Sequence, residues 1–158
     1  MTISVIIPAL NEETMLAKTL AHTAALGFDD IIVVDGGSVD RTVQLAEAYC
    51  ARTPTVHIIT APKGRARQMN EGAKASKGDT LLFLHADTQL PGDAGEIIES
   101  ALADPTVKGG RFDVCFDHPS MWGITIGLFM NWRSRLSRIA TGDQAIFEYL
   151  REEPRPWL

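Results

Sequence analysis

Residues 80–88 read Thr-Leu-Leu-Phe-Leu-His-Ala-Asp-Thr, and this stretch decides the fold class. The four apolar residues 81–84 have the length and composition of a strand that is buried on both faces of a parallel sheet. The strand ends at His85-Ala86-Asp87, where two side chains that can contact a cation or a hydroxyl come together. Ligands of open α/β sheets bind at the carboxyl ends of the strands. On this stretch alone, Asp87 could equally serve only to begin the turn before Pro91.

The rest of the chain alternates short apolar runs with amphipathic stretches. Apolar runs predict three further strands, at residues 3–7, 31–34 and 56–60, and Pro8 is expected to end the first. Amphipathic stretches predict helices over about residues 12–26, 39–50, 65–76 and 94–103. A further strand over 107–116 and a helix over 119–139 are expected after them. This alternation predicts a doubly wound α/β domain with a mostly parallel sheet and helices on both faces.

Several local details accompany these predicted helices. Asn11 is expected to be the N-cap of the first helix, which places Glu12 in its first turn. Either Ser38 or Asp40 is expected to cap the second helix. Val39 in the second helix and Ile97 in the fourth are expected to face inward.

The overall composition excludes several classes of protein. A chain of 158 residues with 45% hydrophobic residues fits one globular domain, and its net charge of −5 argues against nucleic acid as a partner. Cys50 and Cys115 lie far apart, so we expect neither a disulfide framework nor a zinc site, and a reducing cytoplasm is the expected location. We expect no secretory signal. The longest apolar run, 121–130, is about half of the ~20 residues that a membrane-spanning helix needs.

Three polar clusters follow three of the predicted strands, at residues 8–12, 35–38 and 85–87. Because these strands are expected to be parallel, their carboxyl ends share one edge and the clusters can converge there. Cationic side chains at residues 63, 65 and 67 follow the third strand on the same edge. Carboxylates, glycine loops and cations together suit a phosphorylated ligand held through a divalent metal. The GxGxxG and GxxxxGK[ST] motifs are absent, which disfavours a nicotinamide enzyme and a P-loop hydrolase.

The motifs Ser-Val-Ile-Ile-Pro-Ala-Leu-Asn-Glu-Glu (4–13), Val-Val-Asp-Gly-Gly-Ser (33–38) and Leu-His-Ala-Asp-Thr (84–88) together resemble family-2 glycosyltransferases of the GT-A fold. Two more segments, Gly-Arg-Ala-Arg-Gln-Met-Asn (64–70) and Thr-Gly-Asp-Gln-Ala-Ile-Phe (141–147), are similar to a bacterial subgroup of small, soluble members. The resemblance implies a GT-A domain over residues 1–147, followed by a divergent tail over 148–158.

This resemblance implies inverting transfer of a sugar from a nucleoside-diphosphate sugar, with a UDP-sugar favoured, to an acceptor that the sequence does not identify. Pro8, Ala9 and Glu12 are then expected to line the nucleoside pocket. Asp35 is expected to contact the base, and Arg65 to lie near the base or the diphosphate.

His85-Ala86-Asp87 occupies the position of the family's DxD metal motif, with His85 in place of the first aspartate. Asp87 is therefore the expected ligand of Mn²⁺ or Mg²⁺, while His85 is expected to contact ribose or to act through water. The family's general base is an acidic residue downstream of the segment that matches 141–147, and the chain ends at Leu158 without such a motif. Asp143 is the remaining candidate, although a role in the substrate loop is the preferred interpretation for it.

Structural roles are the alternatives for some of these residues: Asp35 could only cap the Gly36-Gly37 turn, and Glu12 could be only a helix charge. Three functions stay open. They are an active glycosyltransferase, a nucleotide-sugar-binding domain that no longer transfers, and a sugar-phosphate nucleotidyltransferase, whose usual glycine-rich first loop residues 8–12 do not resemble. The chain is expected to be a truncated or a natural short form, which could dimerise through exposed apolar surface. Arginines 133, 135 and 138 could contact an anionic membrane, although a solvated edge is the preferred interpretation.

Overall fold

The computed structural model describes residues 1–113, 131–133 and 145–150. The strands are β1 (Ile3–Ala9), β2 (Asp30–Asp35), β3 (Val56–Thr60), β4 (Thr80–Phe83), β5 (Gly109–Arg111) and β6 (Ile146–Tyr149). The helices are α1 (Leu16–Ala25), α2 (Thr42–Cys50), α3 (Arg65–Ala75) and α4 (Ala94–Leu102), and residues 131–133 are also helical.

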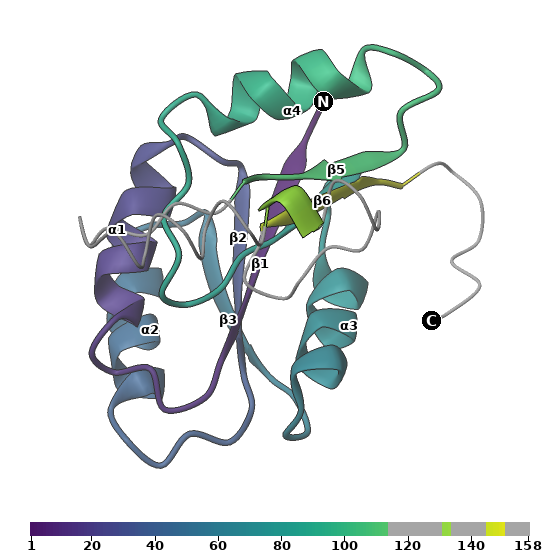
Figure 1. Cartoon of the computed structure of the whole chain (residues 1–158). Helices are drawn as coiled ribbons and strands as arrows, with labels where there is room; N and C mark the ends of the chain where they lie inside the picture. Colours follow the sequence, from purple (N-terminus) through teal and green to yellow (C-terminus); the bar gives the residue numbers. More distant parts are fainter. Residues whose placement is uncertain (114–130, 134–144, 151–158) are drawn as a thin grey trace.

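The six strands form one sheet in the order β3-β2-β1-β4-β6-β5 (Figure 1). Strands β1 to β4 are parallel, while β6 runs antiparallel to both of its neighbours. Strand β1 lies at the centre of the parallel part, where Val5 is paired with Ile31 on one side and with Leu82 on the other. The prediction of a mostly parallel sheet is therefore confirmed.

Helices cover both faces of this sheet, as predicted for a doubly wound domain. Helices α1, α2 and α4 pack on one face, against the alternate strand residues Val5, Ile7, Ile31 and Val33. Helix α3 lies on the opposite face (Figure 1), where Ala73 packs with Ile6, Ile32, Val34 and Leu81. The strands therefore bury side chains on both faces, which explains their nearly continuous apolar sequences.

Strand β1 continues through Pro8 to Ala9, so the prediction that Pro8 ends this strand is wrong. The N–H and C=O of one residue point to the same side of a strand, and successive residues alternate between the two sides. The Ile6 carbonyl accepts a hydrogen bond from Leu84 N on the β4 side (2.9 Å), so Pro8 also faces that side. Strand β4 ends at Phe83. Pro8 therefore lies where the pairing of β1 with β4 ends, and a missing N–H at the end of a ladder is tolerated.

Helix α1 begins at Leu16, later than predicted, and Asn11 is not its N-cap. Asn11 instead has a left-handed backbone with φ of 57°, and a turn follows it in which Glu12 O accepts from Leu16 N (2.9 Å). Of the two candidate caps of α2, Asp40 contacts the first turn, because its Oδ1 accepts from Thr42 N (2.9 Å). Ser38, the other predicted cap, instead accepts a hydrogen bond from Asn11 N.

Two residues that were expected to face inward are exposed. Val39 lies before α2 in the β2–α2 loop and is 91% exposed. Ile97 is 41% exposed, whereas its neighbour Ile98 is fully buried. The inward face of α4 consists of the buried Ala94 and Ile98, one turn apart, with Ala101 and Leu102 partly buried beside them.

Some predictions fall outside the described residues. These are most of the helix expected over 119–139, the end of the strand expected over 107–116, Asp143, and the tail beyond residue 150. Strand β5 lies within the predicted strand, and β6 continues to Tyr149, past the boundary expected at residue 147. Among the residues that are described, no helix has the length and apolar character needed to cross a membrane.

Candidate functional site at the carboxyl edge of the sheet

Backbone and side-chain hydrogen bonds join the loops that follow β1 and β2. Asn11 N donates to Ser38 Oγ, and Val39 N donates back to Asn11 Oδ1, both at 2.9 Å. Glu12 N donates to Thr42 Oγ1 at 2.8 Å. The first two polar clusters therefore converge, as the parallel arrangement of their strands predicts.

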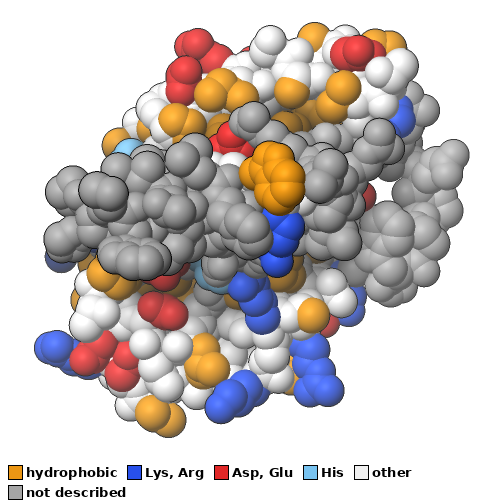
Figure 2. Space-filling model, in the orientation of Figure 1, with side chains coloured by type: hydrophobic (Ala, Val, Ile, Leu, Met, Phe, Trp, Pro, Cys, Tyr) orange, Lys and Arg blue, Asp and Glu red, His pale blue; other side chains and the backbone are white. Residues whose placement is uncertain are grey.

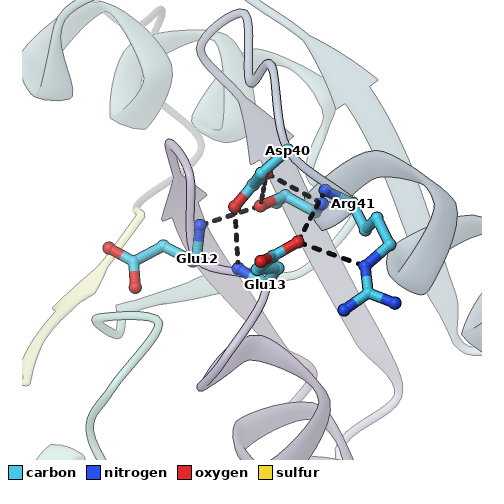
Figure 3. A network of polar contacts seen from close by, with 5 residues as sticks. Glu12, Glu13, Asp40 and Arg41 are labelled. Atoms are coloured by element: carbon cyan, nitrogen blue, oxygen red, sulfur yellow. Dashed lines mark hydrogen bonds and ion pairs between the residues drawn. The ribbon is translucent and has the colours of Figure 1, made fainter.

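Figure 3 shows the hydrogen bonds and the ion pair that charged residues form between these two loops. Asp40 Oδ2 accepts from Glu13 N (3.2 Å), while Glu13 Oε2 accepts from both Arg41 N (3.1 Å) and Arg41 Nε (3.3 Å). The side chains of Glu13, Asp40 and Arg41 thus hold the loops together. The carboxylate of Glu12 points away from this network.

The pKa of Glu12 is raised above its usual value of 4.5. Desolvation by burial is the largest cause, followed by the negative charges of Asp87 and Asp40. Asp87 lies in the loop after β4, so its effect on Glu12 places these two carboxylates close together at one edge. The first and third polar clusters of the sequence therefore also meet.

Asp35 at the end of β2 is almost fully buried, at 3% exposure. Its carboxylate accepts hydrogen bonds from Gly37 N (2.9 Å) and Ser38 N (3.1 Å). Gly37 has φ of +92°, which favours glycine in this tight turn. Asp35 thus caps its own turn, which was the structural alternative for this residue. An ionised carboxylate has about four acceptor positions, so Asp35 retains capacity for a further donor.

The loop after β4 is anchored beneath the exposed Asp87. Thr19 Oγ1 of α1 donates to Ala86 O at 2.6 Å, and Thr88 N donates to His85 O at 3.2 Å. Asp87 itself is exposed, while Nε2 of His85 is buried. The turn therefore presents the Asp87 carboxylate to solvent on a fixed backbone.

No group of three His, Cys, Asp or Glu side chains within residues 1–113, 131–133 and 145–150 is arranged to hold a metal ion. Asp87, with Glu12 nearby, offers carboxylate oxygens of the kind that Mg²⁺ and Mn²⁺ prefer. Such ions commonly keep several waters and take further ligands from substrate phosphates. The donor set thus fits a cation that is bound jointly with a phosphorylated ligand.

Arg65 begins α3, directly after Gly64, and its side chain is exposed, as are those of Lys63 and Arg67. The start of this loop is tied to β2, because Ala61 N donates to Asp35 O at 2.9 Å. Figure 2 shows several Lys and Arg side chains over the lower half of the face, where the β2–α2 and β3–α3 loops lie in Figure 1. Cationic groups therefore flank the carboxylate edge.

Residues 4–148 match the family model described as Glycosyl transferase family 2. The chain belongs to this family. The resemblance that the motifs indicated is therefore confirmed, and the strand-end loops described above are those of a family-2 glycosyltransferase.

Two curated relatives of this family-2 chain are named as sugar transferases that act with a lipid phosphate. The undecaprenyl-phosphate 4-deoxy-4-formamido-L-arabinose transferase of Pseudomonas paraeruginosa is 32% identical over 147 residues, which are 87% of this chain and 41% of the relative. The dolichol-phosphate mannosyltransferase of Pyrococcus furiosus is 32% identical over 126 residues, 72% of this chain and 36% of the relative. The chain thus spans about two fifths of the length of these relatives.

Solved structures show the same fold at low sequence identity. A mannosyltransferase from Pyrobaculum calidifontis in complex with GDP-Man and Mn²⁺ superimposes with a TM-score of 0.69 at 22% identity, covering 92% of this chain and 44% of that one. Glucosyl-3-phosphoglycerate synthase from Mycobacterium tuberculosis in complex with UDP gives 0.65 at 20% identity, covering 94% and 56%. The predicted GT-A fold is confirmed by these similarities.

Within this family-2 fold, the predicted site residues lie at the carboxyl edge of the sheet: Pro8, Ala9, Glu12, Asp35, Arg65, His85 and Asp87. Gln68, a buried side chain of α3 that contacts the ends of β1 and β2, was not predicted as a site residue from the sequence. One signal was present in the sequence. Gln68 and Gly72 lie one helical turn apart, beside the buried Ala73, and a polar residue on an inward stripe indicates a buried hydrogen-bond partner.

Proposed function

We propose that this chain binds a nucleoside-diphosphate sugar at the carboxyl edge of β1, β2 and β4 and transfers the sugar, with inversion, to a polyprenyl phosphate. The observation that carries the proposal is the convergence of Glu12 and Asp87 at that edge, where burial and then the charge of Asp87 raise the pKa of Glu12. Two carboxylates beside cationic loops suit a ligand that combines a divalent metal with a diphosphate.

In this proposal each loop has one task. Pro8 and Ala9 line the nucleoside pocket. Asp35 contacts the base with its remaining acceptor capacity, and Arg65 contacts the base or the diphosphate. A UDP-sugar is the favoured donor. GDP-Man and UDP in the similar structures support a nucleoside diphosphate in general.

Asp87 holds the divalent cation in this proposal, with Glu12 close by, and His85 contacts the ribose or acts through water. The bound Mn²⁺ or Mg²⁺ would stabilise the negative charge that gathers on the departing diphosphate. The Mn²⁺ in the complex of one similar structure supports the use of a divalent cation in general.

Inverting transfer also needs a general base on the opposite face of the sugar to remove the acceptor proton. Asp143 remains the candidate named by the sequence, and it lies outside the described residues. Polyprenyl phosphate is proposed as the acceptor because undecaprenyl phosphate and dolichol phosphate occur in the names of the relatives. We also propose a cytoplasmic location, a homodimer and contact with an anionic membrane surface.

The first experiment measures donor binding. Melting temperature and calorimetric affinity are recorded with UDP and with GDP, each with Mn²⁺ and with a chelator in its place. We expect one nucleotide to raise the melting temperature only with the metal. Asp87→Asn should abolish this effect. Asp29→Asn is the matched control, because Asp29 is exposed and precedes β2 at the opposite edge of the sheet.

The second experiment measures transfer from the radiolabelled donor to a short-chain polyprenyl phosphate. Lipid-linked product whose anomeric configuration is inverted would support the full proposal. Binding of the nucleotide without any product would limit the function to donor binding. If neither nucleotide binds in the presence of metal, the donor site itself is wrongly assigned.

A further inference from the structure

Gln68 is a buried amide at the carboxyl end of the two central strands. It lies in the first half of α3 and is only 3% exposed. Its Nε2 donates to Ala9 O and to Val34 O, both at 2.8 Å. Because both partners are carbonyl acceptors, only the NH₂ group can face them, which fixes the orientation of the amide. One side chain therefore bridges β1 and β2.

Gly36 provides the space that this bridge needs. A Cβ at residue 36 would lie 2.9 Å from Cδ of Gln68 and 3.0 Å from Nε2 and Oε1, so the amide lies flat against the glycine. Gly36 N also donates to Ala9 O at 2.9 Å. The carbonyl of Ala9 thus receives one hydrogen bond from the β2–α2 loop and one from α3.

The bridge lies where the two strands separate into their loops. Ala9 pairs with Asp35 in the last step of the β1–β2 register. Beyond this pair the chain enters the loops that carry Asn11, Glu12 and Ser38. A donor bound there would contact loops whose relative position depends on the strand ends.

The opposite end of the same two strands is held by a separate buried network. Ser4 Oγ donates to Asp30 Oδ2 at 2.6 Å and accepts from Gly78 N at 2.8 Å. This network also joins β1 to β2, and it lies far along the strands from the carboxyl-end loops. Variants at the two ends can therefore separate an effect on overall stability from an effect on the position of the carboxyl-end loops.

We infer that Gln68 is a positioning residue of the donor site: its amide fixes the spacing of the β1–α1 and β2–α2 loops that receive the nucleotide. The inference rests on the proposed function for the identity of the ligand. The hydrogen bonds and the contact with Gly36 stand independently of that ligand.

The test compares Gln68→Met, which keeps the length of the side chain and removes both N–H donors, with Ser4→Ala as the control. UDP affinity with Mn²⁺ and hydrogen exchange of the Gly36, Gly37 and Ser38 amides are measured where all variants are folded. Gln68→Met should raise the Kd about tenfold and speed exchange of these amides about tenfold, through loss of buried hydrogen bonds and preorganisation. Ser4→Ala should lower the melting temperature and leave both readouts unchanged.

A double-mutant cycle tests the contact with Gly36. Gly36→Ala alone should speed loop exchange, because the new methyl group displaces the amide of Gln68. In a Gln68→Ala background the three atoms nearest to this methyl group are gone, and the same change should have a much smaller effect. Additive effects would overturn the inference, as would a Gln68→Met variant with normal exchange and normal affinity.

The outcome also separates this inference from the proposed function. If UDP and GDP fail to bind the wild-type protein, the donor assignment fails. The exchange rates still decide whether Gln68 positions the loops. If the nucleotide binds but Ser4→Ala weakens it as much as Gln68→Met does, the role of Gln68 is only structural and the inference is wrong.

Discussion

Replacing Gly72 in α3 by alanine is expected to destabilise the protein, although alanine favours helices. A Cβ at this position would lie 2.4 Å from Cγ2 of Ile6 and 3.0 Å from Cγ2 of Val34. Both partners are fully buried strand residues that cannot withdraw into solvent. Helix α3 would therefore have to move away from the sheet to accommodate the methyl group.

The size of this effect follows from two opposing contributions. Alanine in place of glycine inside a helix stabilises by at most about 1 kcal/mol. Overpacking of a close-packed core costs about 1–3 kcal/mol, and the upper part of that range applies because carbon atoms at optimal contact are about 3.5–4.0 Å apart. A net loss of about 2 kcal/mol is expected, which for a domain of this size lowers the melting temperature by about 4–8 °C.

Gly95→Ala is the matched control, because Gly95 also lies in a helix and a Cβ there would meet nothing within 4 Å. This variant should be as stable as the wild type or more stable by up to about 1 kcal/mol. Both variants are compared by thermal and urea denaturation followed by circular dichroism. If Gly72→Ala matches the wild type in stability, or if the two variants lose stability equally, α3 does not pack on the sheet as closely as described.

Three further predictions concern the site and the opposite edge. Asp87→Asn should lower the pKa of Glu12 toward 4.5, because a neighbouring negative charge is removed, and NMR titration of the side-chain carbon measures this. Because the folded state raises the pKa of Glu12, stability should fall as the pH rises from 4.5 through the raised pKa. Glu12→Gln should therefore be more stable than the wild type above that window and lose its advantage below it, in urea denaturation across pH. Ser4→Ala should cost about 1–3 kcal/mol, measured in the same way, because it leaves buried partners unsatisfied; an unchanged urea midpoint would contradict this.

The parallel part of the fold could be predicted because its central strands β1 and β2 are buried on both faces, so that continuous apolar runs identified them. Strand β3 is a partly buried edge strand, and its bounds also agree with the prediction. At the antiparallel edge, a strand was predicted around β5, which consists of Gly109-Gly110-Arg111, but β6 and its antiparallel pairing were not predicted. The reason for these glycines is tertiary: a Cβ at Gly110 would lie 2.5 Å from Cζ of Phe147 in β6. Strand β5 therefore depends on a partner strand that lies far along the chain.

The candidate site could be predicted to about the same extent as the fold. Parallel strands bring their carboxyl ends together, so the convergence of the Glu12 and Asp87 loops followed from the order of the elements. The contacts between loops did not follow, because Asn11 was interpreted as a local helix cap and its amide instead bonds Val39 across 28 residues. Capping residues form similar hydrogen bonds to local and to distant amides, so sequence spacing alone could not separate the two roles.

The electrostatics of this edge indicate why a cation and a nucleotide should bind together. The raised pKa of Glu12 means that its charged form is destabilised by burial and by Asp87 and Asp40. A diphosphate entering alone would add negative charge beside these carboxylates and would increase that cost. A divalent cation is attracted both to the carboxylates and to the diphosphate. It therefore lowers the electrostatic free-energy cost of bringing these negative groups together. In the proposed function the carboxylate edge therefore selects the metal-bound nucleotide over the free one.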